Sequence, residues 1–205
     1  LEYLSARLAQ ENLIFIGEIH HIDSVQDSIT KLIVALKKRQ PNRKIVLFSE
    51  FINLPARENR SPRDLATYYR RITQADLAPI TEAEGYKIDY APFLFFEMLY
   101  NNIEVCPLED SAQLKMFDEA SQSDENISVF TTVERNKTWA RVIEAKMAQV
   151  RKTDPDALFV VYAGMGHTSW IMPYSLPKFF ARENPAVVEV TKEKLSSFTS
   201  LRLVW

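Results

Sequence analysis

The chain has 205 residues, of which 46% are hydrophobic, and these values are typical of one globular domain with a sizeable core. Its 25 basic and 27 acidic residues give a net charge of −2, which argues against a nucleic acid or an anionic membrane as partner. The single cysteine, Cys106, excludes an internal disulfide framework and a cysteine-based zinc ribbon. No apolar run approaches the roughly 20 residues of a transmembrane segment.

The first half of the sequence predicts strands alternating with helices. Short apolar runs bounded by turn residues indicate buried strands, and apolar residues at three- and four-residue spacing indicate helices. The expected elements are a helix over 1–10, a strand over 12–16, a helix over 24–39, a strand over 44–49, a helix over 91–100 and a strand over 102–106.

The second half continues the pattern with helices over 111–120, 132–151 and 173–182 and strands over 157–163, 186–190 and 201–205. Strands that are apolar on both faces and separated by helices are typical of parallel sheets. We therefore expect an α/β fold with a mainly parallel central sheet and helices on both faces, as a single domain over residues 1–205. The polar segment 53–90, which contains three prolines, is predicted to form a variable helical cap beside a site.

Glycine is unusually scarce in this chain. Average usage of about 7% would give about 14 glycines, but there are four glycines and three histidines. Six of these seven residues fall in two short strings, IGEIHH at 16–21 and YAGMGH at 162–167. This concentration directs attention to the ends of two predicted strands.

Polar side chains follow each of the predicted parallel strands, where ligands of such sheets bind. Glu18 and His20 follow the first strand, Glu50 the second and His167 the fourth. Glu109 and Asp110 follow the third, where loop solvation or helix capping is the favoured interpretation. We expect the first four groups to meet in one crevice.

These residue types support acid–base or metal chemistry. Glu18 and His20 are two residues apart, so both side chains lie on one side of an extended segment, as a general acid–base pair or as ligands of a divalent metal. His21 then faces away and is interpreted as structural. Gly17, Gly164 and Gly166 are expected to provide a positive φ or a close approach of the backbone to a ligand, and their N–H groups could stabilise an oxyanion. The alternative is that they only turn the chain after a strand.

Arg135 and Asn136 are predicted at the start of a helix, where an arginine can hold a substrate anion through two hydrogen bonds. A solvated helix start is the alternative for both residues. Cys106 is interpreted as a structural thiol in a buried strand. The sequence contains no GxGxxG, Walker, HExxH or GxSxG motif.

The strings IGEIHH, FSEF, ERNKTWA and VYAGMGH, in this order between Leu13 and His167, resemble the motifs of the Tiki/ChaN/erythromycin-esterase superfamily. The resemblance implies an α/β fold like that of ChaN and the erythromycin esterases. Members include metal-dependent peptidases, esterases, haem-binding proteins and peptidase domains of bacterial toxins. The residues that match the shared site are Glu18, His20, Glu50 and His167, with Arg135 at the helix-start position.

The favoured function is therefore a bacterial hydrolase of the peptidase or esterase type, acting on a protein or small-molecule ester or amide through an activated water. Glu18 is expected to be the base, helped by His20, while His167 protonates the leaving group. Glu50 orients a histidine, and Gly164, Gly166, Arg135 and Asn136 contact the substrate. If a metal takes part, we expect Zn²⁺, Mn²⁺ or Fe²⁺ on the four shared residues.

Two alternatives remain open. The first is a ChaN-like protein of haem or iron uptake, located in the periplasm, at the outer membrane or outside the cell. Its haem ligand would come from Tyr68, Tyr69, Tyr86 or Tyr90. The second is a toxin or effector peptidase domain that recognises a protein through residues 53–90.

Overall fold

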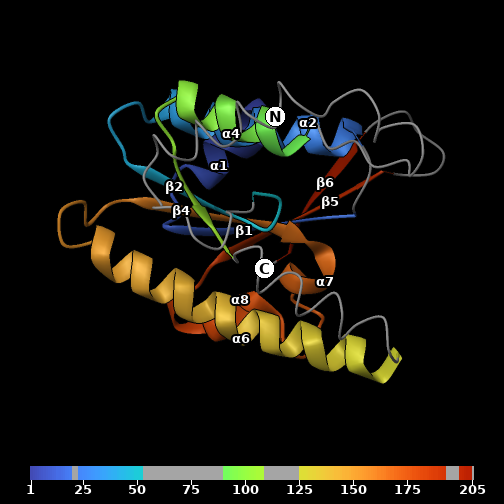
Figure 1. Ribbon diagram of the computed structural model, residues 1–205. Helices are drawn as coiled ribbons and strands as arrows, with labels where there is room; N and C mark the ends of the chain where they lie inside the picture. The colour runs from blue at the N-terminus through green and yellow to red at the C-terminus, as the bar shows by residue number, and fades with distance from the viewer. Residues whose placement is uncertain (20–22, 53–89, 109–124, 193–198, 205) are drawn as a thin grey trace, which may run out of the picture.

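Five parallel strands and one antiparallel strand form the sheet at the centre of the computed structural model, which describes residues 1–19, 23–52, 90–108, 125–192 and 199–204 (Figure 1). The strand order is β3-β2-β4-β1-β5-β6, and only β6 runs antiparallel to its neighbour. The strands are β1 (Leu13–Glu18), β2 (Ile45–Ser49), β3 (Glu104–Pro107), β4 (Leu158–Gly164), β5 (Ala186–Lys192) and β6 (Thr199–Val204).

Helices cover both faces of this sheet (Figure 1). One layer contains α1 (Glu2–Leu8), α2 (Asp23–Arg39) and α4 (Tyr90–Tyr100). The other contains α6 (Glu125–Val150), α7 (Met165–Thr168), α8 (Leu176–Phe179) and the 3₁₀ helix η1 (Ala181–Glu183). The predicted α/β fold with a mainly parallel sheet and helices on both faces is confirmed.

The strands β1 to β5 contribute side chains to two hydrophobic cores, because successive side chains point to opposite faces. Ile14 and Ile16 of β1 pack in the core beneath α1, α2 and α4, whereas Leu13 and Phe15 pack against α6 and α8. This double burial is why the strands read as continuous apolar runs. The same alternation determines which of the two helix layers the side chain of a strand-end residue faces.

Two helix predictions differ from the structure. The expected helix over 173–182 is wrong, because α8 begins only at Leu176 and the chain passes at Phe180 into η1. Pro177 fits the first turn of a helix but not its interior, so a helix that started at 173 could not run through it. The helix expected at 132–151 begins earlier, at Glu125, because neither glycine nor proline occurs between Pro107 and Pro155 to delay it.

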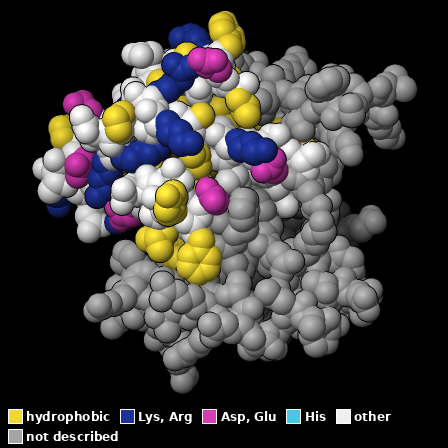
Figure 2. Space-filling model, turned by 90° about the horizontal axis from the view of Figure 1, so that it is seen from above, with side chains coloured by type: hydrophobic (Ala, Val, Ile, Leu, Met, Phe, Trp, Pro, Cys, Tyr) yellow, Lys and Arg dark blue, Asp and Glu magenta, His cyan; other side chains and the backbone are white. Residues whose placement is uncertain are grey.

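The predicted cap at 53–90 and the predicted helix at 111–120 fall in ranges almost wholly outside the described residues. Figure 2 shows the face that carries α1, α2 and α4, where basic, acidic and hydrophobic side chains are interspersed over the described part. Among all the residues that the structure describes, no helix is both long and apolar enough to span a bilayer.

Candidate functional site

A cluster of charged side chains lies where β2 and β4 end, against α6. Glu50 directly follows β2, His167 lies in α7 just beyond β4, and Arg135 lies inside α6 rather than at its start. Glu50 Oε1 accepts a hydrogen bond from Arg135 Nη2 at 3.1 Å and lies 3.8 Å from His167 Nε2. The three side chains are 12%, 16% and 9% exposed for Glu50, Arg135 and His167. Ionic contacts at this depth are screened by water less than surface ion pairs are.

The second carboxylate oxygen of Glu50 is held by the protein backbone. Glu50 Oε2 accepts a hydrogen bond from the Gly164 N–H at 2.8 Å, and the Glu50 N–H donates to the Tyr162 carbonyl at 3.2 Å. The Gly164 amide therefore positions Glu50 in this structure, and its role as an oxyanion donor stays a prediction. Gly164 has φ −58°, so its conformation does not require glycine.

Asn136 determines how the imidazole of His167 is oriented. The Asn136 side-chain amide donates from Nδ2 to the Tyr174 carbonyl at 2.8 Å, which directs its Oδ1 toward His167 Nδ1 at 2.7 Å. Since Oδ1 is only an acceptor, Nδ1 must carry the proton. In the neutral ring Nε2 then has the lone pair, and Nε2 is the nitrogen that faces Glu50. Asn136 is thus a positioning residue for a histidine, where the sequence suggested contact with substrate.

Trp139 is a site residue that the sequence analysis missed. It is fully buried, its ring centroid lies 4.5 Å from that of His167, and the Arg135 guanidinium lies 4.8 Å from its ring. The indole therefore packs against one side of the imidazole and also makes a cation–π contact with the Arg135 guanidinium. The available signal was its position four residues after Arg135, which places both on one helix face.

Glu18 lies on the other face of the sheet. Its side chain follows Ile14 and Ile16 into the layer of α2, where its Oε2 accepts a hydrogen bond from the Tyr162 hydroxyl at 2.5 Å and its Oε1 faces Gln26 Nε2 at 3.4 Å. The carboxylate is 1% exposed. The prediction of one crevice therefore holds for Glu50 and His167, whereas Glu18 is bound within the opposite layer.

The glycines of the two strings have different surroundings. A Cβ on Gly17 would lie 2.2 Å from Thr168 Oγ1 and 3.3 Å from Met165 Cα, so Gly17 lets α7 pack directly on β1. Gly166 is exposed, and a Cβ there would meet nothing within 4 Å. The close approach at Gly17 is therefore to another part of the protein, and no steric requirement for glycine exists at 166.

The predicted site residue His20 lies outside the described residues, as do His21, Glu109 and Asp110, for which a structural or solvated role was favoured. Among the residues that the structure describes, no three His, Cys, Asp or Glu side chains are grouped as a metal would require. Because His20 is one of the four expected ligands, the metal site stays a prediction. Arg135 supplies the positive charge that Glu50 meets in this structure.

No family model matches the sequence, and a search of curated proteins found no match either. Among solved structures, the chain is similar to ChaN of Campylobacter jejuni, described as binding haem cofacially, with a TM-score of 0.59 and 14% identity. That alignment covers 100% of this chain and 92% of ChaN. The type III effector HopBA1 gives a TM-score of 0.49 at 15% identity over 81% of this chain and 72% of its own.

A bacterial protein toxin gives a TM-score of 0.48 at 15% identity, over 98% of this chain and 38% of the toxin. The similarity to ChaN extends over the whole chain and shows that the two proteins share a fold. At this level of identity it shows nothing about the ligand or the reaction.

Proposed function

We propose that the chain is a hydrolase of esters or amides in which His167 activates the attacking water. The observation that carries the proposal is the fixed orientation of His167, which places Nε2 opposite Glu50 while Asn136 holds Nδ1. An imidazole held in this way is suited to general acid–base catalysis, because one nitrogen keeps its proton while the other exchanges one.

In the proposed reaction, Nε2 of His167 takes a proton from water as the water oxygen attacks the substrate carbonyl carbon. The resulting imidazolium is stabilised by the carboxylate of Glu50, 3.8 Å away. The positive charge of Arg135 stabilises the oxyanion of the tetrahedral intermediate. When the intermediate collapses, the bond to the leaving group breaks and His167 returns the proton to it, which gives a carboxylic acid and an alcohol or amine.

The first test uses p-nitrophenyl butyrate as a probe ester, with His167→Gln and Glu50→Gln compared with the wild type. Removing a general base is expected to lower the rate by about 10²–10⁴-fold. The matched control is Glu134→Gln, because Glu134 is on the same helix as Arg135 but pairs with Lys137 near the surface. Circular dichroism verifies that each variant is folded.

The proposal is wrong if wild-type protein hydrolyses the ester no faster than unfolded protein, or if His167→Gln keeps the wild-type rate. Glu18→Gln separates this mechanism from the one expected from the sequence. A loss as large as that of His167→Gln would make Glu18 the base instead.

Haem binding is the second candidate function. It is supported by the fold shared with ChaN and by an exposed segment directly after α7, in which Met172 is 45% and Tyr174 59% exposed. Methionine sulfur and tyrosine oxygen are both known ligands of haem iron. Tyr68, Tyr69 and Tyr86 lie outside the described residues, and Tyr90 begins α4.

Titration with haem is expected to give a Soret shift that saturates at stoichiometric haem and is weakened by Tyr174→Phe. Tyr100→Phe is the control, because Tyr100 is also exposed but lies at the end of α4. Absence of any shift at stoichiometric haem would eliminate this candidate. The effector alternative stays a prediction, to be tested by intact-mass measurement after incubation with protein substrates.

A further inference from the structure

The short helix α7 connects the ends of three parallel strands. Ala163 of β4, Gly17 of β1 and Glu189 of β5 stand side by side in the strand pairing. A Cβ on Gly17 would lie 2.2 Å from Thr168 Oγ1, so α7 passes directly over the middle of this row. Ser169, the residue that ends α7, reaches Glu189 at the far end of the row. The chain therefore leaves β4, crosses β1 and is held at β5.

A buried hydrogen bond makes the contact with β5. The Ser169 hydroxyl donates to Glu189 Oε1 at 2.7 Å, and the two residues are 7% and 9% exposed. Hydrogen bonds to a carboxylate are stronger than those between neutral groups, and burial keeps water from competing for them. The Ser169 N–H also donates to the Met165 carbonyl at 2.9 Å, which closes the single turn of α7. Glu189 is thus tied to the whole turn through one serine.

Tertiary contacts must decide where α7 lies. The helix has four residues, and a turn of this length is not stable alone, because fixing its backbone costs more than its hydrogen bonds return. His167 belongs to this turn and lies two residues before Ser169. A movement of Ser169 away from β5 would therefore move the imidazole relative to Glu50, which is 3.8 Å from its Nε2.

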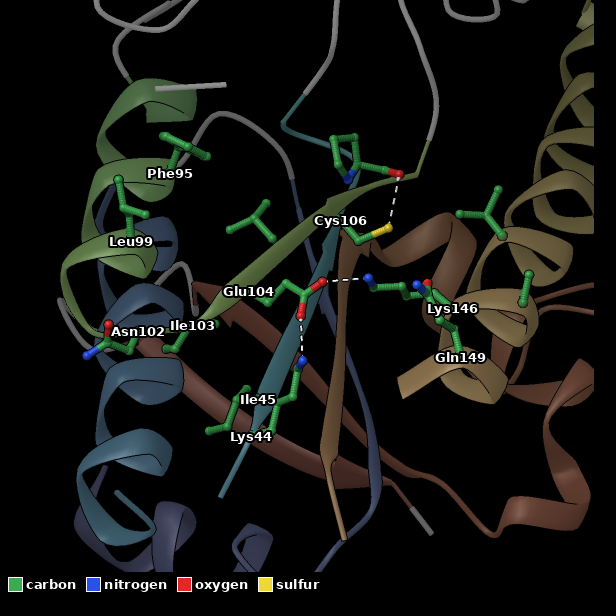
Figure 3. A pocket seen from close by; sticks show the side chains of 14 residues that line it. Lys44, Ile45, Phe95, Leu99, Asn102, Ile103, Glu104, Cys106, Lys146 and Gln149 are labelled. Carbon is green, nitrogen blue, oxygen red and sulfur yellow. Dashed lines mark hydrogen bonds and ion pairs between the residues drawn. The ribbon is translucent and has the colours of Figure 1, made fainter. Parts of the chain in front are cut away.

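Glu104 is a partly buried glutamate with a different role. It lines a cavity of about 860 Å³ beside β3, where Figure 3 shows it between Lys44 and Lys146. Its Oε1 lies 2.5 Å from Lys146 Nζ and its Oε2 3.0 Å from Lys44 Nζ, and Lys44 Nζ also lies 3.8 Å from Asp154 Oδ2. Burial alone would raise the pKa of the Glu104 carboxyl, but hydrogen bonds from the two lysines outweigh it and leave the pKa below its usual value. Two lysines here face two carboxylates, so this cluster is balanced in charge.

We propose that Glu189 is a positioning residue for His167 and acts through Ser169. It holds the end of α7 at β5, while Asn136 holds Nδ1 of the imidazole, so the backbone and the ring of His167 are fixed by separate hydrogen bonds. The kinetic consequence rests on the proposed hydrolase function, whereas the effect on the imidazole does not. Arg202 stands opposite Glu189 in the pairing of β5 with β6, so a role of Glu189 through its charge is the competing explanation.

The first measurement is the ¹⁵N NMR spectrum of the imidazole nitrogens, which identifies the tautomer without any activity. Glu189→Met keeps most of the side-chain length but removes the acceptor, so His167 is expected to leave Asn136 Oδ1 and to populate both tautomers. Glu189→Gln keeps an oxygen that accepts from Ser169 and should give the wild-type spectrum. The matched control is Glu144→Met, the same substitution at an exposed position of α6. His167→Gln identifies the signals.

The second measurement is the hydrolysis of p-nitrophenyl butyrate. Glu189→Met should lower kcat at least about tenfold, because a displacement of about 1 Å at a catalytic group can cost about 10²-fold in rate. KM should change less than about twofold, because Glu189 does not contact the substrate. Ser169→Ala should have the same effect as Glu189→Met, and the double variant should be no slower than either, because both changes remove one hydrogen bond.

Each arm can overturn the proposal. It is wrong if Glu189→Met keeps the wild-type imidazole spectrum, or if Glu189→Gln changes the spectrum as much as Glu189→Met does, since the charge would then be what matters. Should Glu189→Met fail to fold by circular dichroism, Ser169→Ala tests the same bond by removing only a hydroxyl, and a wild-type spectrum for that variant would refute the proposal. If wild-type protein does not hydrolyse the ester, the hydrolase function fails, and the spectra still decide the role of Glu189.

Discussion

Replacing Gly17 with alanine tests how α7, which carries His167, is seated on the sheet. The new Cβ would lie 2.2 Å from Thr168 Oγ1, although contacts below 3.0 Å essentially never occur, so the atoms must separate by about 0.8 Å. Thr168 is fully buried, so turning its side chain to relieve the contact would move its methyl group within a packed region and break the hydrogen bond from its hydroxyl to the Gly164 carbonyl. The other route is a displacement of α7.

Overpacking of this kind should lower the free energy of unfolding by about 1–3 kcal/mol, measured from urea denaturation. Gly166→Ala is the matched control in the same short helix, because its Cβ has open space. It should be neutral or raise the free energy of unfolding by up to about 1 kcal/mol.

Thr168→Ala removes Oγ1, the atom with which the new Cβ of Gly17→Ala would clash. The double variant should therefore be less destabilised than the two single variants together, with a coupling energy of about 0.5–3 kcal/mol. Additive effects, or a Gly17→Ala protein that unfolds at the wild-type urea midpoint, would refute the packing argument.

Three further changes test other contacts. Tyr162→Phe removes the hydroxyl that donates to the buried Glu18 carboxylate and should cost about 1–3 kcal/mol of unfolding free energy by urea denaturation. Ser175→Ala should leave the melting temperature unchanged or raise it, because the Ser175 hydroxyl is buried and has no hydrogen-bond partner among the residues that the structure describes. The lowered pKa of Glu104 adds stability that is present above the unfolded pKa of about 4.3 and is lost as the pH falls through the folded pKa. Glu104→Gln should consequently lose less stability than the wild type between pH 7 and pH 3, as compared by urea midpoints.

The centre of the sheet was predictable because its strands are buried on both faces. The predicted runs at 12–16, 44–49, 157–163 and 186–190 all overlap β-strands of the structure, since only strands covered by helices on both sides tolerate such sequences. Short helices were less predictable. The four-residue helix α7 has no room for a hydrophobic period, and its position depends on the tertiary contact with Gly17.

The site was predictable only in part, because some of its contacts depend on tertiary packing. Strand ends identified Glu50 and His167, because their placement follows from the parallel sheet alone. The link from Asn136 to His167 spans 31 positions and depends on where α6 crosses β4, which no local pattern encodes. The backbone carbonyl of Tyr174, which fixes the Asn136 amide, has no sequence signature at all.

Strand order and side-chain alternation together separate the two glutamates that the sequence placed in one crevice. β4 lies between β2 and β1, so Glu50, directly after β2, and Glu18, at the end of β1, both lie beside the strand that leads to His167. Glu50 has the same parity as Phe48, whose side chain packs beneath α6, whereas Glu18 has the parity of Ile16, which packs beneath α2. Glu50 therefore meets Arg135 and His167, and Glu18 meets Tyr162.

This separation predicts different consequences for two chemically identical substitutions. Glu50→Gln should lower ester hydrolysis much more than stability, because the uncharged amide no longer stabilises an imidazolium at His167. Glu18→Gln should chiefly lower the free energy of unfolding, since it weakens a charge-assisted hydrogen bond that ties the end of β1 to β4 in a buried layer. Urea denaturation and p-nitrophenyl butyrate hydrolysis, measured on both variants, give the comparison. If Glu18→Gln abolishes hydrolysis at unchanged stability, the two faces of the sheet act as one site and the division argued from side-chain alternation is wrong.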